Sequence, residues 1–150
     1  LDVFVGTLGE SHPELARAFS NFGNLYALRG EYYKAIEFFQ KALTIHLKQF
    51  GVEHPYVANS YSNLGNVYNS LGDYKKAIEW FEKSAAQGFA QAQLNVGMMY
   101  KEGLGVEKNY KKAFELFEKA ANQNQKRALL ELGDSYMLGQ GVEKNLKKAF

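Results

Sequence analysis

The sequence predicts an all-α solenoid built from stacked antiparallel helical hairpins. In residues 63–88, apolar residues fall at helical spacing in two blocks separated by Leu71, Gly72 and Asp73, which indicates a helix, a tight turn and a second helix. The same pattern occurs 42 residues earlier, and a related pattern with a period of 36 residues follows. Repetition at a fixed period is the signature of architectures in which each hairpin buries its apolar face against its neighbours.

The first two hairpins share the 42-residue period. We expect helices over residues 14–28 and 32–49 in the first hairpin, and over residues 56–71 and 74–87 in the second. Pro13 suits the first position of a helix, where its missing N–H costs nothing. The positions that recur are Gly23, Tyr26, Gly30, Tyr32, Lys34, Ala35, Ile36, Glu37 and Phe39, which correspond to Gly65, Tyr68, Gly72, Tyr74, Lys76, Ala77, Ile78, Glu79 and Phe81.

After residue 88 the repeat changes. The new period brings four additional residues into the turn between the two helices, which covers residues 102–109. Gly103 and Gly105 suggest positions with positive φ in that turn, and Asn109 and, one repeat later, Asn145 suit the N-caps of the segments that follow. The positions that recur are Leu94, Gly97, Tyr100, Gly103, Gly105, Val106, Lys112, Ala113 and Phe114, which correspond to Leu130, Gly133, Tyr136, Gly139, Gly141, Val142, Lys148, Ala149 and Phe150.

These periods divide the chain into five segments. Residues 1–8 are expected to be the tail of a preceding repeat helix, and residues 9–50 and 51–88 are two hairpins of the first type. Residues 89–124 form a hairpin of the second type, and residues 125–150 form a shortened copy of it. Gly88 and Asn124 are the expected C-caps between hairpins. Because the pattern stops part-way through a repeat, we interpret the chain as a segment of a longer array.

The composition excludes several classes of protein. The net charge of +2 is too small to indicate a nucleic-acid or membrane-surface partner, and no apolar run approaches the length of a membrane span. The absence of cysteine excludes disulfides and cysteine zinc sites. It does not fix the compartment, although the cytoplasm is favoured. No set of acid, base and nucleophile residues converges, so the sequence predicts no enzyme and no cofactor.

Three kinds of residue suggest chemistry but have simpler explanations. His12, His46 and His54 do not have the spacing of a zinc site, and linker or surface positions explain them. The Gly-x-Gly turns follow helices rather than strands and do not match a phosphate-binding loop. The lysine pairs at residues 75–76, 111–112 and 147–148 begin second helices. We expect one lysine of each pair to be solvated and the other to lay its stem on apolar surface, with a basic stripe for an acidic partner as the alternative.

The recurring tyrosines allow two interpretations. Tyr26, Tyr68, Tyr100 and Tyr136 each lie three residues after the small glycine, on the expected packing face. A stacking platform for nucleic-acid bases is conceivable, but core packing is the favoured prediction.

The motifs resemble two known repeat families. Residues 9–88 resemble tetratricopeptide repeats of the kinesin-light-chain type. The resemblance rests on the 42-residue period, the Gly-x-x-His-Pro linker and the small and large positions given above. Residues 89–150 resemble SEL-1-like repeats, on Leu-x-x-Gly-x-x-Tyr, Gly-x-Gly-Val, Lys-Ala and Ala120-Ala121. That family usually has Asp where Asn109 and Asn145 stand. The resemblance implies a hybrid array that forms a right-handed α–α superhelix and binds partners in a concave groove, without catalysis.

The resemblance also implies which residues face the groove. In tetratricopeptide repeats the groove positions lie six, three and two residues before the glycine and one after it, and here several carry asparagine. Helices rarely gain stability from so many asparagines, and their amides can donate to and accept from a peptide backbone. The predicted groove residues are Arg17, Ser20, Asn21, Asn24, Asn59, Ser62, Asn63, Asn66, Asn69, Asn95 and Met98. Phe19, Tyr61 and Met98 are expected to border the groove and form pockets for apolar side chains.

Three functional hypotheses follow in order of preference. The first is a protein-interaction scaffold that binds a peptide or protein partner in the groove. The second is an architectural or engineered hybrid segment with no ligand of its own, and the third is RNA binding by helical repeats. We also expect self-association through the shortened C-terminal edge, where Leu129, Leu132, Tyr136 and Leu138 lack the cover of a following helix.

Overall fold

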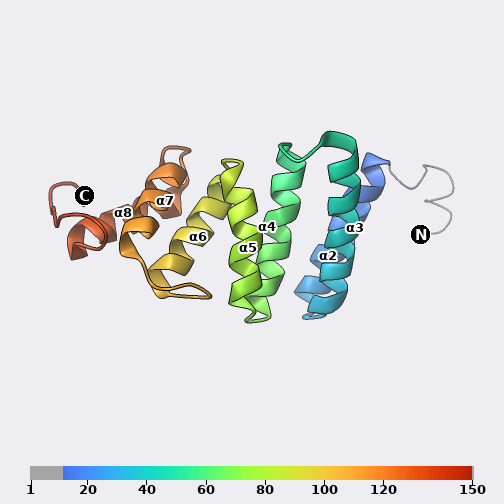
Figure 1. The fold of residues 1–150 in the computed structure, drawn as a ribbon, viewed down its shortest axis with the longest axis horizontal. Helices are drawn as coiled ribbons and strands as arrows, with labels where there is room; N and C mark the ends of the chain where they lie inside the picture. Colours follow the sequence, from blue (N-terminus) through green and yellow to red (C-terminus); the bar gives the residue numbers. More distant parts are fainter. Residues whose placement is uncertain (1–11, 150) are drawn as a thin grey trace.

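The computed structural model describes residues 12–149, and these residues hold seven helices and no strand. The helices pack in sequence as an elongated row of hairpins (Figure 1). The predicted tail over residues 1–8 lies outside the described residues. The helices are α2 (Pro13–Leu28), α3 (Tyr32–Phe50), α4 (Pro55–Ser70), α5 (Tyr74–Ala86), α6 (Ala90–Glu102), α7 (Tyr110–Ala121) and α8 (Lys126–Leu138). The prediction of an all-α solenoid of helical hairpins is confirmed.

In the first three hairpins, a glycine on the first helix faces a phenylalanine on the second. A Cβ atom added to Gly23, Gly65 or Gly97 would lie 2.5–2.6 Å from a ring carbon of Phe39, Phe81 or Phe117, respectively. All three phenylalanines are almost fully buried. The absence of a side chain at these glycines is therefore what lets the two helices approach closely enough to enclose the ring.

The turns within hairpins lie along the lower edge of Figure 1, and the linkers between hairpins lie along the upper edge. His12 and His54 precede the helix-starting prolines at the linkers, and each Nδ1 atom accepts from a backbone N–H two residues later, at 3.3 and 3.2 Å. These two histidines are N-caps, a role that the sequence analysis missed. Asn109 and Asn145 cap their segments as predicted, since their side chains accept from backbone N–H groups at 3.0–3.2 Å.

The junction between the two repeat types is continuous. Ile78 and Phe81 of α5 share one buried cluster with Val96 and Met99 of α6, and Ala85 packs against it. Gly88 turns the chain with φ of +81°. Asn124 stands at the same position one repeat later with φ of +62°, where it is the one non-glycine residue with positive φ in residues 12–149.

The recurring tyrosines pack against the core, as predicted, but each also carries a lysine on its exposed face. Tyr26, Tyr68 and Tyr100 are half-buried against the core clusters, and the ring of Tyr136 meets Phe114 edge-on at 5.5 Å. The ammonium groups of Lys34, Lys76, Lys112 and Lys148 lie 5.2, 5.3, 5.0 and 5.6 Å from the centroids of Tyr26, Tyr68, Tyr100 and Tyr136. This geometry is that of a cation–π contact, so the lysine that lies on apolar surface is the second of each pair.

The additional residues in the second repeat type form a contact between hairpins. Gly103 and Gly105 have φ of +75° and +71°, as predicted. Gly105 also lies against the backbone carbonyl of Tyr74, where an added Cβ would collide with the C=O group. Gly141 makes the same approach to the carbonyl of Tyr110. The longer turn therefore packs on the first residue of the preceding hairpin's second helix.

The two glycines of one turn should respond differently to alanine. Gly103→Ala should cost about 1–2 kcal/mol, because only positive φ is strained there and the nearest atom, Cβ of Lys108, is at an ordinary 3.4 Å. Gly105→Ala should cost about 1–3 kcal/mol more, because the turn must also move away from Tyr74. Urea unfolding of both variants measures the difference. Equal costs would contradict the packing of this turn on α5.

The loss of stability caused by a substitution at Gly88 should depend only on how well the new residue tolerates positive φ, because an added Cβ meets no atom within 4 Å. Gly88→Val should destabilise the protein by about 1–2 kcal/mol. Gly88→Asn should cost clearly less, because Asn124 already adopts this conformation in the next repeat. Thermal and urea melts of the two variants check the ranking, and equal stability of the valine variant and the wild type would contradict it.

Candidate functional site

The first helices of the four hairpins are α2, α4, α6 and α8. The predicted groove residues lie on the first three of these helices. We call the surface of these helices the helix-A face. The exposed members are Arg17, Asn21, Asn24, Asn59, Asn66 and Asn69, and the half-buried members are Ser20, Asn63, Asn95 and Met98. Ser62 is only 3% exposed, so it offers no atom to a partner.

Four of the predicted residues meet in a hollow of about 230 Å³ at the boundary between the two repeat types, which we call the junction hollow. Asn66 and Asn69 come from α4, and Asn95 and Met98 come from α6. The lining is completed by Phe81, Leu94, Met99, Glu102, Leu104 and Arg127. The structure thus brings together amides of two consecutive first helices over an apolar floor.

Three other predicted residues border a second hollow, of about 400 Å³, which we call the linker hollow. Arg17 and Ser20 of α2 and Asn59 of α4 stand at its wall, together with Pro13, Glu14, His46, Phe50 and Tyr56. Some polar side chains at this hollow already have partners within the protein. Ser20 donates to the backbone oxygen of Ala16 at 2.9 Å, and Arg17 lies 3.8 Å from Glu14.

The remaining predicted residues do not line either hollow. Asn21 and Asn24 are exposed on α2, and Asn63 donates to the side-chain oxygen of Asn59 at 3.2 Å. The continuous row expected from sequence is therefore divided into two separate places on the helix-A face.

The prediction that Phe19 and Tyr61 form side-chain pockets is wrong. Their exposed fractions are 8% and 9%, and both belong to buried core clusters. Tyr61 packs against Trp80 with ring centroids 5.7 Å apart. These two aromatic rings fill the interior between helices, and only Met98 of the three expected pocket residues lies at a hollow.

The last repeat replaces amides with an ion pair. Lys101 of α6 and Glu131 of α8 are joined at 2.7 Å, and their side chains are only 19% and 11% exposed. Glu131 stands at the same repeat position as Asn95 and Asn63. Such a pair fixes the relative position of two helices, so this position serves packing in the last repeat rather than binding.

His46 is the titratable side chain most affected by its surroundings near the linker hollow. Its Nδ1 atom lies 2.8 Å from Oγ of Ser60, and that hydroxyl donates to the carbonyl of Tyr56 at 3.0 Å. Burial lowers the pKa of His46, and the neighbouring His54 lowers this pKa further. No group of three potential metal ligands occurs in residues 12–149, and no helix among them is long and apolar enough to cross a membrane.

The lowered pKa of His46 makes stability depend on pH. In the unfolded chain the imidazole should take up its proton near pH ~6.5, whereas the folded protein resists protonation until a lower pH. The free energy of unfolding should therefore fall as pH decreases below the unfolded pKa. His46→Gln, which keeps a partner for Ser60, should show a smaller fall in thermal melts at several pH values. An identical pH dependence in both proteins would contradict the assignment to His46.

Comparisons with known proteins agree with this architecture. The tetratricopeptide repeat profile matches residues 1–46 and 14–87, and the Sel1 repeat profile matches residues 90–125 and 126–150. A protective antigen of uropathogenic Escherichia coli strains, which displays an SLR fold, is 32% identical with a TM-score of 0.72. A Sel1 repeat protein from Oxalobacter formigenes is 31% identical with a TM-score of 0.66.

The coverage of these structures is uneven. The matches cover 89% and 87% of this chain, but the chain spans only 28% and 51% of those two proteins. A putative kinesin light chain from Podosopora anserina has similar TPR-like repeats, with a TM-score of 0.65, 21% identity and coverage of 86% of this chain and 69% of that chain. At that identity the likeness shows the fold alone. A search of curated protein sequences found no match.

Proposed function

Because this chain belongs to the tetratricopeptide repeat family and continues as Sel1 repeats, we propose that it is a protein-interaction module that holds an extended peptide in the junction hollow. Proteins built from these repeats are generally scaffolds for protein–protein interaction and typically lack catalytic activity. The junction hollow is the place on the helix-A face where four of the predicted groove residues meet.

The observation that carries the proposal is a pair of unused amides at the hollow. Within residues 12–149, the side chains of Asn66 and Asn69 have no hydrogen-bond partner, whereas Asn95 accepts from Gln91 at 3.0 Å. An amide can both donate and accept, which is what a peptide backbone requires. Both side chains are exposed, so binding would not require an existing contact to break.

The floor of the hollow supports apolar side chains. Leu94 and Met99 are 2% and 3% exposed, and Met98 is half-buried above them. Methionine is flexible and polarizable, and adapts to partners of different shape. Glu102 and Arg127 at the wall carry opposite charges, so they can orient a neutral peptide without attracting a strongly charged one.

The expected affinity is modest. Each backbone hydrogen bond contributes about 0.5–1.5 kcal/mol net, and ordering a flexible peptide offsets much of the total. Two or three amide contacts with a small apolar floor are therefore consistent with dissociation constants of about 1 μM or weaker.

The test uses a neutral peptide selected from a library for binding to the whole chain. Asn66→Ala with Asn69→Ala should weaken its binding at least about tenfold, which is what two lost backbone contacts are worth. The melting temperature should stay nearly unchanged, because the two amides make no hydrogen bond within residues 12–149. Isothermal titration and thermal melts measure both quantities.

Asn21→Ala with Asn24→Ala is the matched control, since these asparagines are exposed on α2 and line neither hollow. This variant should bind the peptide as the wild type does. Unchanged affinity in the junction variant, or equal losses in both variants, would move binding away from this hollow. A library that yields no ligand would favour a purely architectural role.

A further inference from the structure

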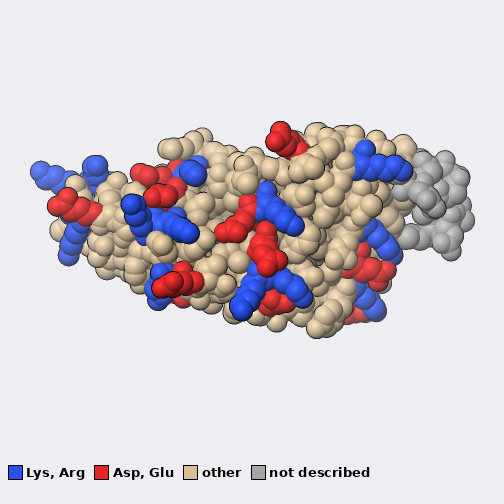
Figure 2. Space-filling model, viewed as in Figure 1, with Lys and Arg blue, Asp and Glu red and all other residues tan. Residues whose placement is uncertain are grey.

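A row of lysines follows the turn edge of the third and fourth hairpins, and none of these lysines lines the junction hollow. It consists of Lys108, Lys111, Lys112, Lys144, Lys147 and Lys148, which are all exposed; we call it the lysine edge. Each group of three contains one glutamate, Glu107 or Glu143, within the same stretch. Figure 2 shows basic side chains gathered at the C-terminal end of the visible face and clusters of mixed sign along the rest.

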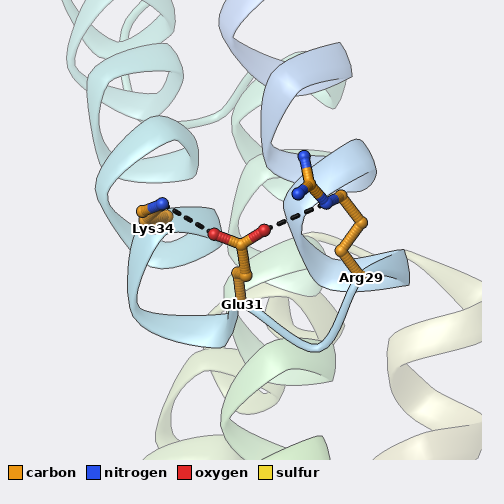
Figure 3. A network of polar contacts seen from close by, with 3 residues as sticks. All are labelled: Arg29, Glu31 and Lys34. Atoms are coloured by element: carbon orange, nitrogen blue, oxygen red, sulfur yellow. Dashed lines mark hydrogen bonds and ion pairs between the residues drawn. The ribbon is translucent and has the colours of Figure 1, made fainter.

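The first hairpin shows how the equivalent lysine is neutralised. Glu31, at the N-cap position of α3, lies 2.6 Å from Lys34 and 3.0 Å from Arg29 (Figure 3). The carboxylate raises the pKa of Lys34, and Lys34 lowers the pKa of Glu31. The charge of the tyrosine-bound lysine is therefore compensated within its own turn.

The second hairpin repeats this arrangement with a different acid. Asp73 caps α5 by accepting from the backbone N–H of Lys76 at 3.2 Å, and its other oxygen lies 3.2 Å from Nζ of Lys76. The aspartate thus performs two tasks, since it satisfies the helix N-terminus and pairs with the lysine on Tyr68.

In the third and fourth hairpins, asparagine occupies the capping position. It caps the backbone but does not form an ion pair with the lysine. Asn109 and Asn145 accept from the backbone as Asp73 does, but they carry no charge. Lys112 and Lys148 still lie over their tyrosines, yet neither has an ion-pair partner within the described chain. The lysines are held in place by stacking while their charge stays available.

These charges also lie where they are electrostatically unfavourable. The N-terminus of a helix carries a partial positive charge, so cations in the first turn destabilise the helix. The first turn of α7 contains Lys111 and Lys112 and no acidic residue. The contact with Tyr100 accounts for Lys112. No ring contact or ion pair within residues 12–149 accounts for Lys111, whereas recognition of an anionic partner does.

We propose that the lysine edge is a second interaction surface, which binds an acidic segment of a partner protein. The two lysine groups follow one another along the edge, because the turn containing Gly141 lies against the backbone of Tyr110 and Lys111. An extended chain with several acidic residues could therefore meet both groups. Single carboxylates suit isolated ammonium groups, which act as point charges.

A protein partner fits better than a nucleic acid. The edge contains no arginine, although arginine is the residue suited to bidentate phosphate contacts. Its tyrosine faces are covered by lysines and offer no free platform for bases.

The test exploits the difference between the capping residues. Asn109→Asp with Asn145→Asp should recreate the arrangement of Asp73 and Lys76, and aspartate caps a helix as well as asparagine does. Binding of a labelled deca-glutamate peptide at low salt, measured by fluorescence anisotropy, should weaken about fivefold or more. The melting temperature should stay the same or rise, because each new carboxylate lies at a helix N-terminus.

A second pair of variants distinguishes the effect of the lysine edge from the effect of the total charge of the protein. Lys111→Gln with Lys147→Gln should weaken deca-glutamate binding similarly, because it removes two exposed charges from the edge. Lys119→Gln with Lys126→Gln removes the same charge from exposed positions in the last turn of α7 and the first turn of α8, and it should have little effect. A deca-glutamine peptide should not bind.

Several results would overturn the proposal. These are an absence of deca-glutamate binding, equal losses in both pairs of lysine variants, and unchanged binding in the aspartate variant. Tighter binding of an oligothymidine of equal charge, or of anionic vesicles, would assign the edge to a nucleic acid or a membrane instead. No lysine of the edge lines the junction hollow, so Asn66→Ala with Asn69→Ala should leave deca-glutamate binding unchanged whether or not the hollow binds a peptide.

Discussion

The whole array depends on the close approach of two helices at a glycine. In three consecutive hairpins, a glycine of the first helix leaves space that a buried phenylalanine ring of the second helix occupies, as between Gly65 and Phe81. This contact sets the distance between paired helices. The side chains that fill the layers between hairpins, such as Leu64 and Val67, are packed to match that distance, because a protein interior has few voids to absorb a change.

The fold followed from the sequence because repetition multiplies each local signal. The glycine, tyrosine and alanine positions occur several times with the same spacing, so helices, turns and the change of period could all be recognised. The roles of His12 and His54 could not, because a histidine ring as an N-cap is set by the ring's orientation beside the backbone N–H. The Gly-Xaa-Gly turns were recognised as turns, but their contact with Tyr74 and Tyr110 depends on how consecutive hairpins stack.

The candidate site was harder to predict than the fold for a specific physical reason. A position relative to the glycine determines which side of a helix a residue occupies, but not what the neighbouring helix places against it. Asn69 and Asn95 border an open hollow, whereas Glu131, at the same repeat position as Asn95, is closed by Lys101. Ser62 and Tyr61 are covered by neighbouring helices although their spacing suggested a surface. Whether a side chain is exposed depends on the residues that the neighbouring repeat places against it. The sequence pattern of one repeat therefore does not predict its exposure.

The turn containing Gly105 has a consequence for how the array comes apart. Its backbone rests on the first residue of α5, and the turn containing Gly141 rests on α7 in the same way. The second and third hairpins therefore contact each other at two places, through their helices and at the turn edge. The same holds for the third and fourth hairpins. The turns of the first two hairpins make no such glycine contact, since a Cβ atom added to Gly30 or Gly72 would meet no atom within 4 Å. In a linear array, where stability is transmitted between nearest neighbours, fraying should begin more readily between the first two hairpins than between those that follow.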